Sequence, residues 1–411
     1  MPRPLSFCMI TTFYPPFSFG GDAIYLQRLC HQLVRAGHQV DVIHCADSYR
    51  LYRPEPPVAP PPPAGLTIHT LRSGFGPLSP LLSHQTGLPL LKAAKIREVF
   101  EAHHFDVIHY HNISLYGPGL LDLSPSYDGW VKLYMMHEHW LVCPMNVLWK
   151  YNERACEKPD CLKCTLVSHR PPQWWRYTGL RDRAARAIDQ FLSPSRFTRD
   201  MHHERGFPYP IEVLPYFLGR VDHEWQSPGP SPHPRPYFLF VGRLEKIKGL
   251  QDILPEFAGE GGYDLLISGS GTYEEELRRQ AQGMSRVHFL GWIPQDRIGP
   301  HYHHALGVIV PSITYETFGI IIIEAFARQT PVIVHDLGAL PEVVHDSGGG
   351  FIYRTPEELR RAMQSLSTDP VLRQDLGRRG YEAYCRYWTP EPHLDQYFSL
   401  IERAAASRQR R

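Results

Sequence analysis

Short apolar runs alternate with segments of helical periodicity from the start of the chain. Residues 7–12 are mostly apolar, and a second such run begins with Val40-Asp41-Val42-Ile43. Between the two runs, apolar side chains recur at the spacing of one helix face, at Tyr25, Leu26, Leu29, Cys30 and Leu33. A strand, a helix and a second strand with no hairpin between them predict a parallel pair joined by a crossover.

The same alternation continues in two stretches of the chain. Residues 106–111 and 132–137 are predicted strands that end in His111 and His137, at the edge where open parallel sheets bind ligands. We expect His109 and His111 to point to opposite faces of the sheet, with His111 toward the ligand cleft. After residue 236 the pattern begins again, with predicted strands at 237–241, 264–267, 287–290, 306–310, 331–334 and 351–353. The chain is therefore predicted to be an α/β protein with two successive parallel-sheet domains and a cleft between them.

Two proline-rich segments divide the chain. Seven of the ten residues from 54 to 63 are proline, which predicts a stiff surface loop. Five of the nine residues from 228 to 236 are also proline, which predicts a linker. We predict a first domain at 1–215, a linker at 216–236 and a second domain at 237–389. A terminal helix at 390–411 is expected to pack back on the first domain.

Composition and charge narrow the class of protein. Of the 411 residues, 43% are hydrophobic and 21% are charged, which is too apolar for a disordered chain. The net charge of +1 predicts no nucleic-acid partner. Since no apolar run approaches the ~20 residues of a membrane span and the N-terminus lacks a secretory pattern, we expect a cytoplasmic protein. The basic amphipathic helix predicted at 88–100 fits either peripheral contact with the inner face of the membrane or an ordinary solvated face.

Candidate chemistry is concentrated in the second half of the chain. Arg243 follows the strand at 237–241 and Lys248 opens the next helix, positions that suit a diphosphate but also suit two surface cations. Gly269 and Gly271 follow the next strand, where an ordinary turn is the alternative to a phosphate loop. They do not extend to a dinucleotide fingerprint, because Glu274 stands where the third glycine should fall.

Two glutamates frame the segment 316–324. Thr317 to Gly319 is predicted to form a helix N-terminus, whose free N–H groups can hold anionic oxygens. Glu324 lies about one and a half turns into that helix among apolar residues, where a buried carboxylate needs hydrogen-bond donors such as sugar hydroxyls. The alternative is an amphipathic helix with one exposed glutamate.

Four of the eight cysteines lie close together in the sequence, at Cys143, Cys156, Cys161 and Cys164. Four thiolates within twenty-two residues can close a tetrahedral zinc site, although the spacing is irregular. Free thiols or a disulfide pair are the alternatives in this stretch.

Taken in order, these segments resemble a retaining glycosyltransferase of the GT-B fold, specifically family 4. In the first half the resemblance rests on Tyr14-Pro15-Pro16, Gly20-Gly21 and residues 37–40. In the second half it rests on residues 240–244, Lys248-Gly249, and residues 267–271, 289–293, 310–312, 316–324, 331–333 and 338–344. The resemblance implies two Rossmann-like domains that face a central cleft.

The resemblance also implies roles for individual residues. Arg243 and Lys248 would bind the diphosphate of a nucleotide-sugar and stabilise charge on the departing nucleotide. Glu316 would accept hydrogen bonds from hydroxyls of the donor sugar, and Glu324 would accept them from the ribose. His137 would contact the donor sugar without forming a covalent intermediate.

The remaining donor-binding positions act through the backbone. Gly20 and Gly21 would let a loop of the first domain approach the diphosphate closely. The expected set in the second domain comprises Gly269, Gly271, Phe318, Gly319 and Ile320.

The function expected from the resemblance is transfer of a UDP- or GDP-linked sugar to an acceptor hydroxyl, in polysaccharide or glycoconjugate biosynthesis. Retention of anomeric configuration, a saccharide or lipid-linked acceptor and catalysis without a metal cofactor are part of this expectation. The alternatives are a GT-B nucleotide-sugar epimerase or hydrolase, and a sugar-nucleotide-binding protein without turnover.

Overall fold

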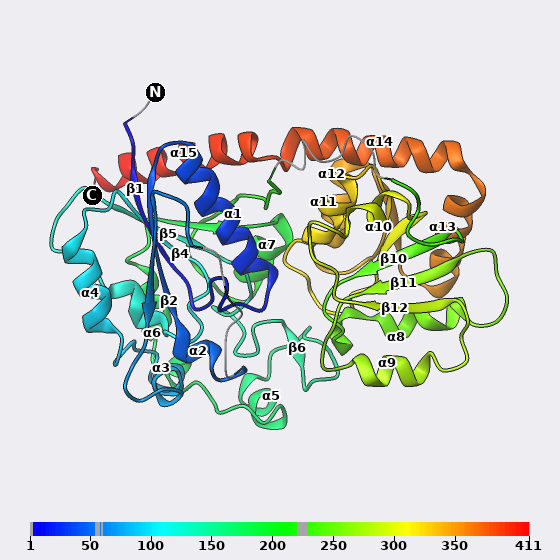
Figure 1. Cartoon of the computed structure of the whole chain (residues 1–411). Helices are drawn as coiled ribbons and strands as arrows, with labels where there is room; N and C mark the ends of the chain where they lie inside the picture. The colour runs from blue at the N-terminus through cyan, green and yellow to red at the C-terminus, as the bar shows by residue number, and fades with distance from the viewer. Residues whose placement is uncertain (1–2, 54–57, 59–60, 220–228, 411) are drawn as a thin grey trace.

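The computed structural model describes residues 3–53, 58, 61–219 and 229–410. Two domains lie side by side, each built on one parallel sheet with helices packed against it (Figure 1). Of the predicted proline-rich loop, residues 54–57, 59 and 60 lie outside the described residues, as do residues 220–228 of the predicted linker.

The first sheet has seven parallel strands in the order β3-β2-β1-β4-β5-β8-β9. Because the chain winds outward from β1 in both directions, the order reverses between β1 and β4, which is where such sheets bind ligands. The strands are β1 (Ser6–Ile10), β2 (Gln39–Cys45), β3 (Leu66–Leu71), β4 (Val107–Tyr110), β5 (Val131–Met135), β8 (Gln190–Ser193) and β9 (Ile211–Val213).

The second sheet has six parallel strands in the order β12-β11-β10-β13-β14-β15, with the reversal between β10 and β13. Its strands are β10 (Tyr237–Val241), β11 (Asp264–Ser268), β12 (Val287–Gly291), β13 (Gly307–Val310), β14 (Val332–His335) and β15 (Gly350–Tyr353). The two doubly wound sheets confirm the predicted α/β class.

Helices connect the strands of both sheets. In the first domain they are α1 (Gly21–Arg35), α2 (Ala46–Tyr49), α3 (Leu78–Thr86), α4 (Ala93–Ala102), α5 (Cys161–Val167), α6 (Leu180–Ala185) and α7 (Arg196–Glu204), with 3-10 turns η1 (Pro118–Asp122) and η2 (Trp174–Tyr177). In the second domain they are η3 (Lys246–Lys248), α8 (Leu250–Ile253), η4 (Leu254–Phe257), α9 (Glu274–Gln280), α10 (Gly299–His303), α11 (Ile320–Phe326), α12 (Leu340–Ser347) and α13 (Pro356–Thr368).

Two long helices run along one side of the molecule, α14 (Pro370–Tyr387) over the second domain and α15 (Pro390–Arg408) over the first (Figure 1). α14 packs against α11, α12 and α13, and α15 packs against β5. The hydroxyl of Tyr397 on α15 is hydrogen-bonded to Nδ1 of His109 on β4 over 2.8 Å. The C-terminal segment thus contacts both domains.

The termini of several helices follow directly from the sequence. The hydroxyls of Ser195 and Thr355 accept hydrogen bonds from backbone N–H groups in the first turns of α7 and α13. The carboxylate of Asp369 does the same at the start of α14, where Pro370 occupies the first helical position.

Three expectations about local structure were wrong. The predicted helix at 88–100 begins only at Ala93, and α11 begins at Ile320 with Gly319 as its N-cap, so Thr317 and Phe318 belong to the preceding loop. His109 and His111 do not point to opposite faces, since their ring centroids lie 4.1 Å apart. Residues two apart on a strand share a face, so the expectation misapplied the period of a strand.

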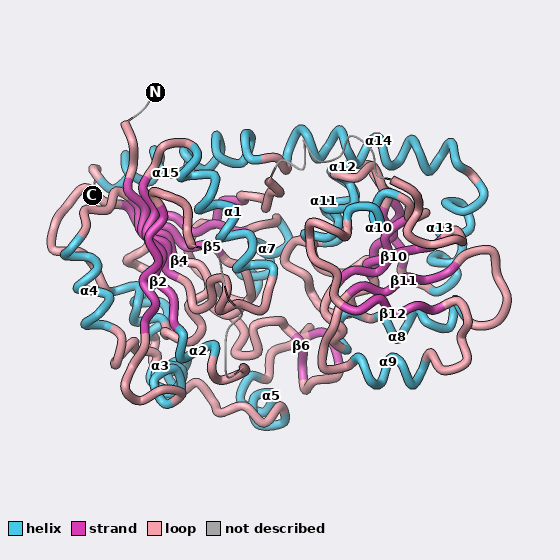
Figure 2. Tube along the Cα trace, in the orientation of Figure 1, coloured by secondary structure: helices cyan, strands magenta, loops and turns pink. Residues whose placement is uncertain are grey.

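The segment between β5 and α6 is mostly loop, with one small antiparallel pair, β6 (Trp149–Lys150) and β7 (Arg154–Ala155) (Figure 2). Within the described ranges, no helix combines the length and the apolar character needed to cross a membrane.

Candidate active site

Three loops meet at the carboxyl edge of the second sheet. They follow the neighbouring strands β11, β10 and β13, so the reversal of strand order brings them together. Backbone hydrogen bonds join them: the N–H of Leu244 donates to the carbonyl of Ser270 over 3.0 Å, and the N–H of Ile313 to the carbonyl of Ile247 over 3.0 Å. The edge is therefore a connected surface on which side chains from distant parts of the sequence converge.

Arg243, Lys248 and Glu316 lie together on this edge. The Lys248 Nζ donates to Glu316 Oε1 over 2.5 Å, and the Ser312 hydroxyl donates to the same oxygen over 2.7 Å. Burial alone would raise the pKa of Glu316, but the charges of Lys248 and Arg243 and the hydrogen bond from Ser312 hold it below its ordinary value. Glu316 is thus held as a carboxylate beside two cations, with 20% of its side chain exposed.

Glycines allow the loops to approach one another. A Cβ on Gly269 would stand 1.8 Å from the carbonyl oxygen of Gly242, and one on Gly271 would stand 2.3 Å from that of Leu244. Gly249 adopts φ +70°, and a Cβ there would lie 1.9 Å from the carbonyl oxygen of Pro311. The packing of the loops accounts for these glycines, including the two predicted to bind the donor.

Glu324 lies on α11 and also faces the first domain. Its Oε1 accepts a hydrogen bond from the Gln295 amide over 3.0 Å, and its Oε2 accepts one from the Tyr302 hydroxyl over 2.9 Å. Arg28 of α1 places Nη2 3.5 Å from Oε1, an ion pair that joins the two domains. The sequence indicated that the carboxylate of Glu324 needs hydrogen-bond donors. Three protein side chains, those of Gln295, Tyr302 and Arg28, already contact it.

The first domain presents His137 to this edge. Its Nε2 lies 2.8 Å from Nδ1 of His111, and its Nδ1 lies 2.5 Å from the Tyr216 hydroxyl. Burial lowers the pKa of His137 to about 4, against the opposing effect of Asp22. The imidazole is therefore neutral at physiological pH and is held by partners on both sides. The sequence did not indicate that His111 and Tyr216 are these partners.

Thr317 connects the loop that carries Glu316 to the first domain. Its hydroxyl donates to the backbone carbonyl of His137 over 3.1 Å. Its own carbonyl accepts hydrogen bonds from the hydroxyls of Ser195, over 2.7 Å, and Thr198, over 3.2 Å. The side chain and the backbone carbonyl of Thr317 therefore bridge the two domains.

The remaining predicted donor-binding residues divide into two groups. Gly20 and Gly21 start α1, and a Cβ on Gly21 would lie 3.3 Å from Cδ1 of Ile320, so the two domains meet there. The side chain of Phe318 is buried against the rings of Tyr216 and Trp388 and belongs to the core, and Gly319 caps α11 at φ +96°.

Glu138 is a further titratable group beside His137. Burial, followed by the charge of Asp22, raises its pKa to about 8, although the Asn146 amide donates to its Oε2 over 3.0 Å. A carboxyl group with such a pKa can exchange a proton near neutrality. The sequence analysis identified the adjacent His137 as a candidate site residue but not Glu138.

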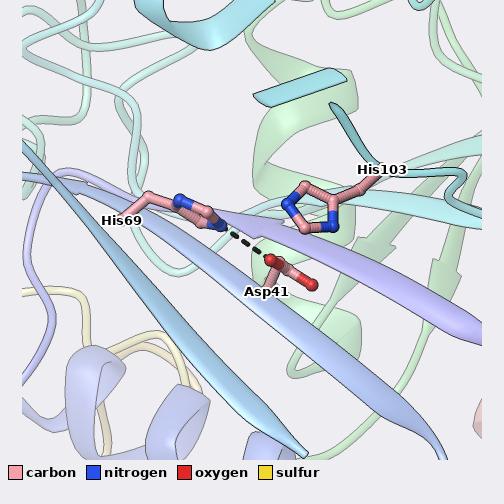
Figure 3. Close-up of side chains that lie close together, drawn as sticks. All are labelled: Asp41, His69 and His103. Atoms are coloured by element: carbon pink, nitrogen blue, oxygen red, sulfur yellow. Dashed lines mark hydrogen bonds and ion pairs between the residues drawn. The ribbon is translucent and has the colours of Figure 1, made fainter. Parts of the chain in front are cut away.

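Among the residues that the structure describes, two clusters of potential metal ligands lie elsewhere. Asp41, His69 and His103 meet beside the first sheet, where His69 and the carboxylate of Asp41 are hydrogen-bonded over 2.6 Å (Figure 3). In the second domain, the imidazoles of His233 and His288 share one oxygen of the buried Asp264. In both clusters a histidine already partners the carboxylate. The predicted cysteine set instead lines one small cavity next to the loop that bears Thr314.

Comparison with known proteins adds the family context. The family model for glycosyltransferase family 4 matches residues 19–217, and the model for glycosyl transferases group 1 matches residues 221–383. An uncharacterized glycosyltransferase of Methanocaldococcus jannaschii is 24% identical over 89% of this chain and 90% of its own length. A D-inositol 3-phosphate glycosyltransferase of Acidothermus cellulolyticus is 28% identical over 95% of this chain and 88% of its own length.

Solved structures share the architecture. Sucrose-phosphate synthase from Thermosynechococcus elongatus superposes with a TM-score of 0.72 at 22% identity, covering 98% of this chain and 100% of that one. An Anabaena protein in complex with UDP and glucose superposes with a TM-score of 0.65 at 16% identity, covering 97% and 99%. At this level of identity the likeness establishes the two-domain fold.

Proposed function

Because this chain belongs to the GT-B glycosyltransferases of group 1 and family 4, we propose that it moves a sugar from a nucleotide-diphosphate-sugar to an acceptor hydroxyl with retention at the anomeric carbon. The observation that carries the proposal is the convergence of Arg243, Lys248 and Glu316 at the edge that faces the first domain. A diphosphate needs the two cations, and a sugar hydroxyl needs the carboxylate.

The donor is proposed to be a UDP- or GDP-sugar. Arg243 is exposed and Lys248 keeps 23% of its side chain exposed, so both cations are accessible to a phosphate that enters the cleft. One structural neighbour binds UDP and glucose, which supports a uridine nucleotide as the first donor to test. Glu324 would hold the ribose through the lone pairs that Gln295 and Tyr302 leave unused.

In the proposed reaction, the acceptor hydroxyl attacks the anomeric carbon from the same face from which the nucleotide departs. The acceptor oxygen forms a bond to the anomeric carbon while the bond from that carbon to the phosphate oxygen breaks. The acceptor proton passes to the departing phosphate, and Arg243 and Lys248 neutralise the charge that develops there. In this mechanism the two protein cations stabilise the negative charge on the departing phosphate, and no catalytic metal is proposed.

His137 is proposed to position the donor sugar. The neutral ring is fixed between His111 and Tyr216, and the backbone carbonyl of His137 holds Thr317 beside Glu316. A rigid neutral imidazole suits a hydrogen-bonding role, and a pKa of about 4 makes it a weak base at neutral pH.

The acceptor is proposed to be a saccharide or a lipid-linked saccharide. Large apolar side chains are exposed around α3 and η2, which are in contact with each other. They include Phe75 at 62%, Leu78 at 56%, Trp174 at 58% and Tyr177 at 61%. Exposed apolar groups on one side of a domain support peripheral contact with a membrane surface at the cytoplasmic face.

A donor panel with an acceptor mixture tests the proposal. We expect transfer from one UDP- or GDP-sugar, with retained anomeric configuration by NMR, and a loss of roughly 10²-fold or more in kcat for Glu316→Gln. The matched control is Glu275→Gln on α9, an exposed glutamate, which should transfer at the wild-type rate. Incubation with donor alone separates an epimerase, which would yield an isomer. Equal rates for both variants, or an inverted product, would refute the proposal.

A further inference from the structure

All four clustered cysteines line a single cavity. Cys143 lies in the loop between β5 and β6. Cys156 follows β7, and Cys161 and Cys164 lie at the start of α5. Cys143, Cys156 and Cys164 are 6%, 9% and 6% exposed. The cavity they line has a volume of about 10 Å³, which is the size that accommodates one water-sized group.

The thiols are close to one another but unbonded. All eight cysteines of the chain lie within the described residues and are free thiols, so no disulfide uses this set. Cys161 lies within electrostatic reach of the other three. No three of the four sulfurs stand within 4.8 Å of one another, so an ion would draw them together by rotation of side chains around the cavity.

The backbone around the cavity is arranged to support sulfur ligands. The N–H of Tyr151 donates to Sγ of Cys164 over 3.4 Å, and the N–H groups of Met145 and Leu148 are directed at the sulfur of Cys143. Burial raises the pKa of the Cys143 thiol, and these N–H groups act against that effect; N–H groups aimed at a sulfur also orient it as a metal ligand.

Cations compensate the charge that four thiolates would bring. Nη1 of Arg205 lies 3.9 Å from the sulfur of Cys156. The charge of Arg176 acts on both Cys143 and Cys161. A tetrathiolate around a divalent ion carries a net charge of −2, and two guanidinium groups beside it offset that charge.

We propose that Cys143, Cys156, Cys161 and Cys164 bind one structural zinc ion. Four cysteines with no nitrogen or oxygen ligand in the set are typical of a closed zinc site, and tetrahedral Zn²⁺ forms bonds of about 2.3 Å to sulfur. With every position filled by a thiolate, the ion has no open site for substrate, so its role is structural.

The ion would also support the active-site edge. The hydroxyl of Thr314, two residues before Glu316, donates to the backbone carbonyl of Val147 over 2.9 Å. Tyr315 packs against the cluster that contains Cys143 and Cys156. The zinc-bound loop therefore buttresses the loop that bears Glu316; this coupling rests on the proposed function, whereas the metal site itself does not.

Metal analysis of the full chain tests the site. Protein purified through a tag that does not bind metal should contain one zinc per chain by mass spectrometry. Cys161→Ser/Cys164→Ser should lose it, and Cys385→Ser, at an exposed thiol far along the chain, should keep it. Less than half an equivalent of zinc in protein grown with added zinc, iron in its place, or unchanged zinc in the double variant would overturn the proposal.

Cobalt substitution provides a second measurement that does not need the variants to fold. The wild-type protein with Co²⁺ in place of zinc should show intense thiolate-to-cobalt charge-transfer bands and the visible bands of a tetrahedral ion. A spectrum without charge transfer would exclude thiolate ligands and refute the site, whatever the outcome of the transfer assay.

Discussion

Buried neutral histidines predict that the protein loses stability in mild acid. Burial lowers the pKa of several histidines far below 6.5, the value expected in an unfolded chain. The pKa falls to about 4 in His44, His84, His137 and His202 and to about 3 in His393. Below pH 6.5 the unfolded state binds protons that the folded state rejects, so this stability is present above pH 6.5 and is lost as the pH falls toward 4.

The magnitude follows from the linkage relation. Between pH 7.5 and pH 5.5 each such histidine removes about 1 kcal/mol or a little more from the free energy of unfolding, which makes roughly 7 kcal/mol for the five. Glu138 acts in the opposite direction, because its pKa is raised to about 8 and its charged form is penalised at pH 7.5. Its protonation returns roughly 2–3 kcal/mol, which leaves a net loss of about 4 kcal/mol from these six groups. That is a large part of a typical stability of about 5–15 kcal/mol.

Urea unfolding followed by fluorescence of the eight tryptophans measures this loss. We expect the midpoint to fall steeply between pH 7.5 and pH 5.5. The neighbours His202, buried, and His203, exposed, form a matched pair. His202→Gln should weaken the pH dependence by about one histidine's share, and His203→Gln should leave it unchanged. A midpoint that stays constant or rises toward pH 5.5, or equal slopes in the two variants, would refute the reasoning.

Three substitutions test the geometry of the site and its loops. Tyr302→Phe removes the donor to Oε2 of Glu324, and we expect KM for the donor to rise about 5- to 10-fold in steady-state assays with kcat nearly unchanged. An unchanged KM would show that this carboxylate does not bind the donor. Thr317→Val removes the hydroxyl that joins the domains and should raise KM several-fold, whereas equal KM would contradict a bridging role. Gly249→Ala should lower Tm far more than Gly259→Ala, because both residues adopt φ +70° but only the first would clash, with a carbonyl at 1.9 Å. Similar Tm values would refute the packing argument.

The fold could be predicted because its signals are local. Apolar runs of five or six residues, separated by helical spacing, are sufficient to indicate doubly wound parallel sheets. The terminal helix, predicted at 390–411, was placed at its observed start, Pro390, because proline marks that position, whereas its observed end is Arg408. Helix starts at 88–100 and 317–319 were placed too early, since side-chain pattern alone does not identify the first hydrogen-bonded turn.

The sequence could predict only those parts of the site that follow from the positions of residues relative to the strand ends. Arg243, Lys248 and Glu316 each follow or adjoin a strand end, so a parallel sheet brings them to one edge. The partners of Glu324 could not be predicted, because Arg28 approaches it from the other domain and no spacing in the sequence records that contact.

The role of the four clustered cysteines could not be predicted from the sequence. These residues were visible in the sequence, but irregular spacing left a metal site, free thiols and a disulfide pair as alternatives. The sequence could not decide between them, because the cavity and the N–H groups directed at sulfur depend on a loop with no periodicity, in which Asn146, Leu148 and Tyr151 adopt positive φ.

Nucleotide binding by calorimetry tests the central claim most directly. Lys248→Met removes the cation that contacts Glu316, whereas Lys246→Met removes an exposed cation two residues earlier on the same turn. The account predicts that UDP or GDP binds the wild-type chain, that Lys248→Met raises Kd about 10-fold or more, and that Lys246→Met changes Kd less than twofold. Equal Kd values for the two variants, or no binding of either nucleotide by the wild type, would contradict it.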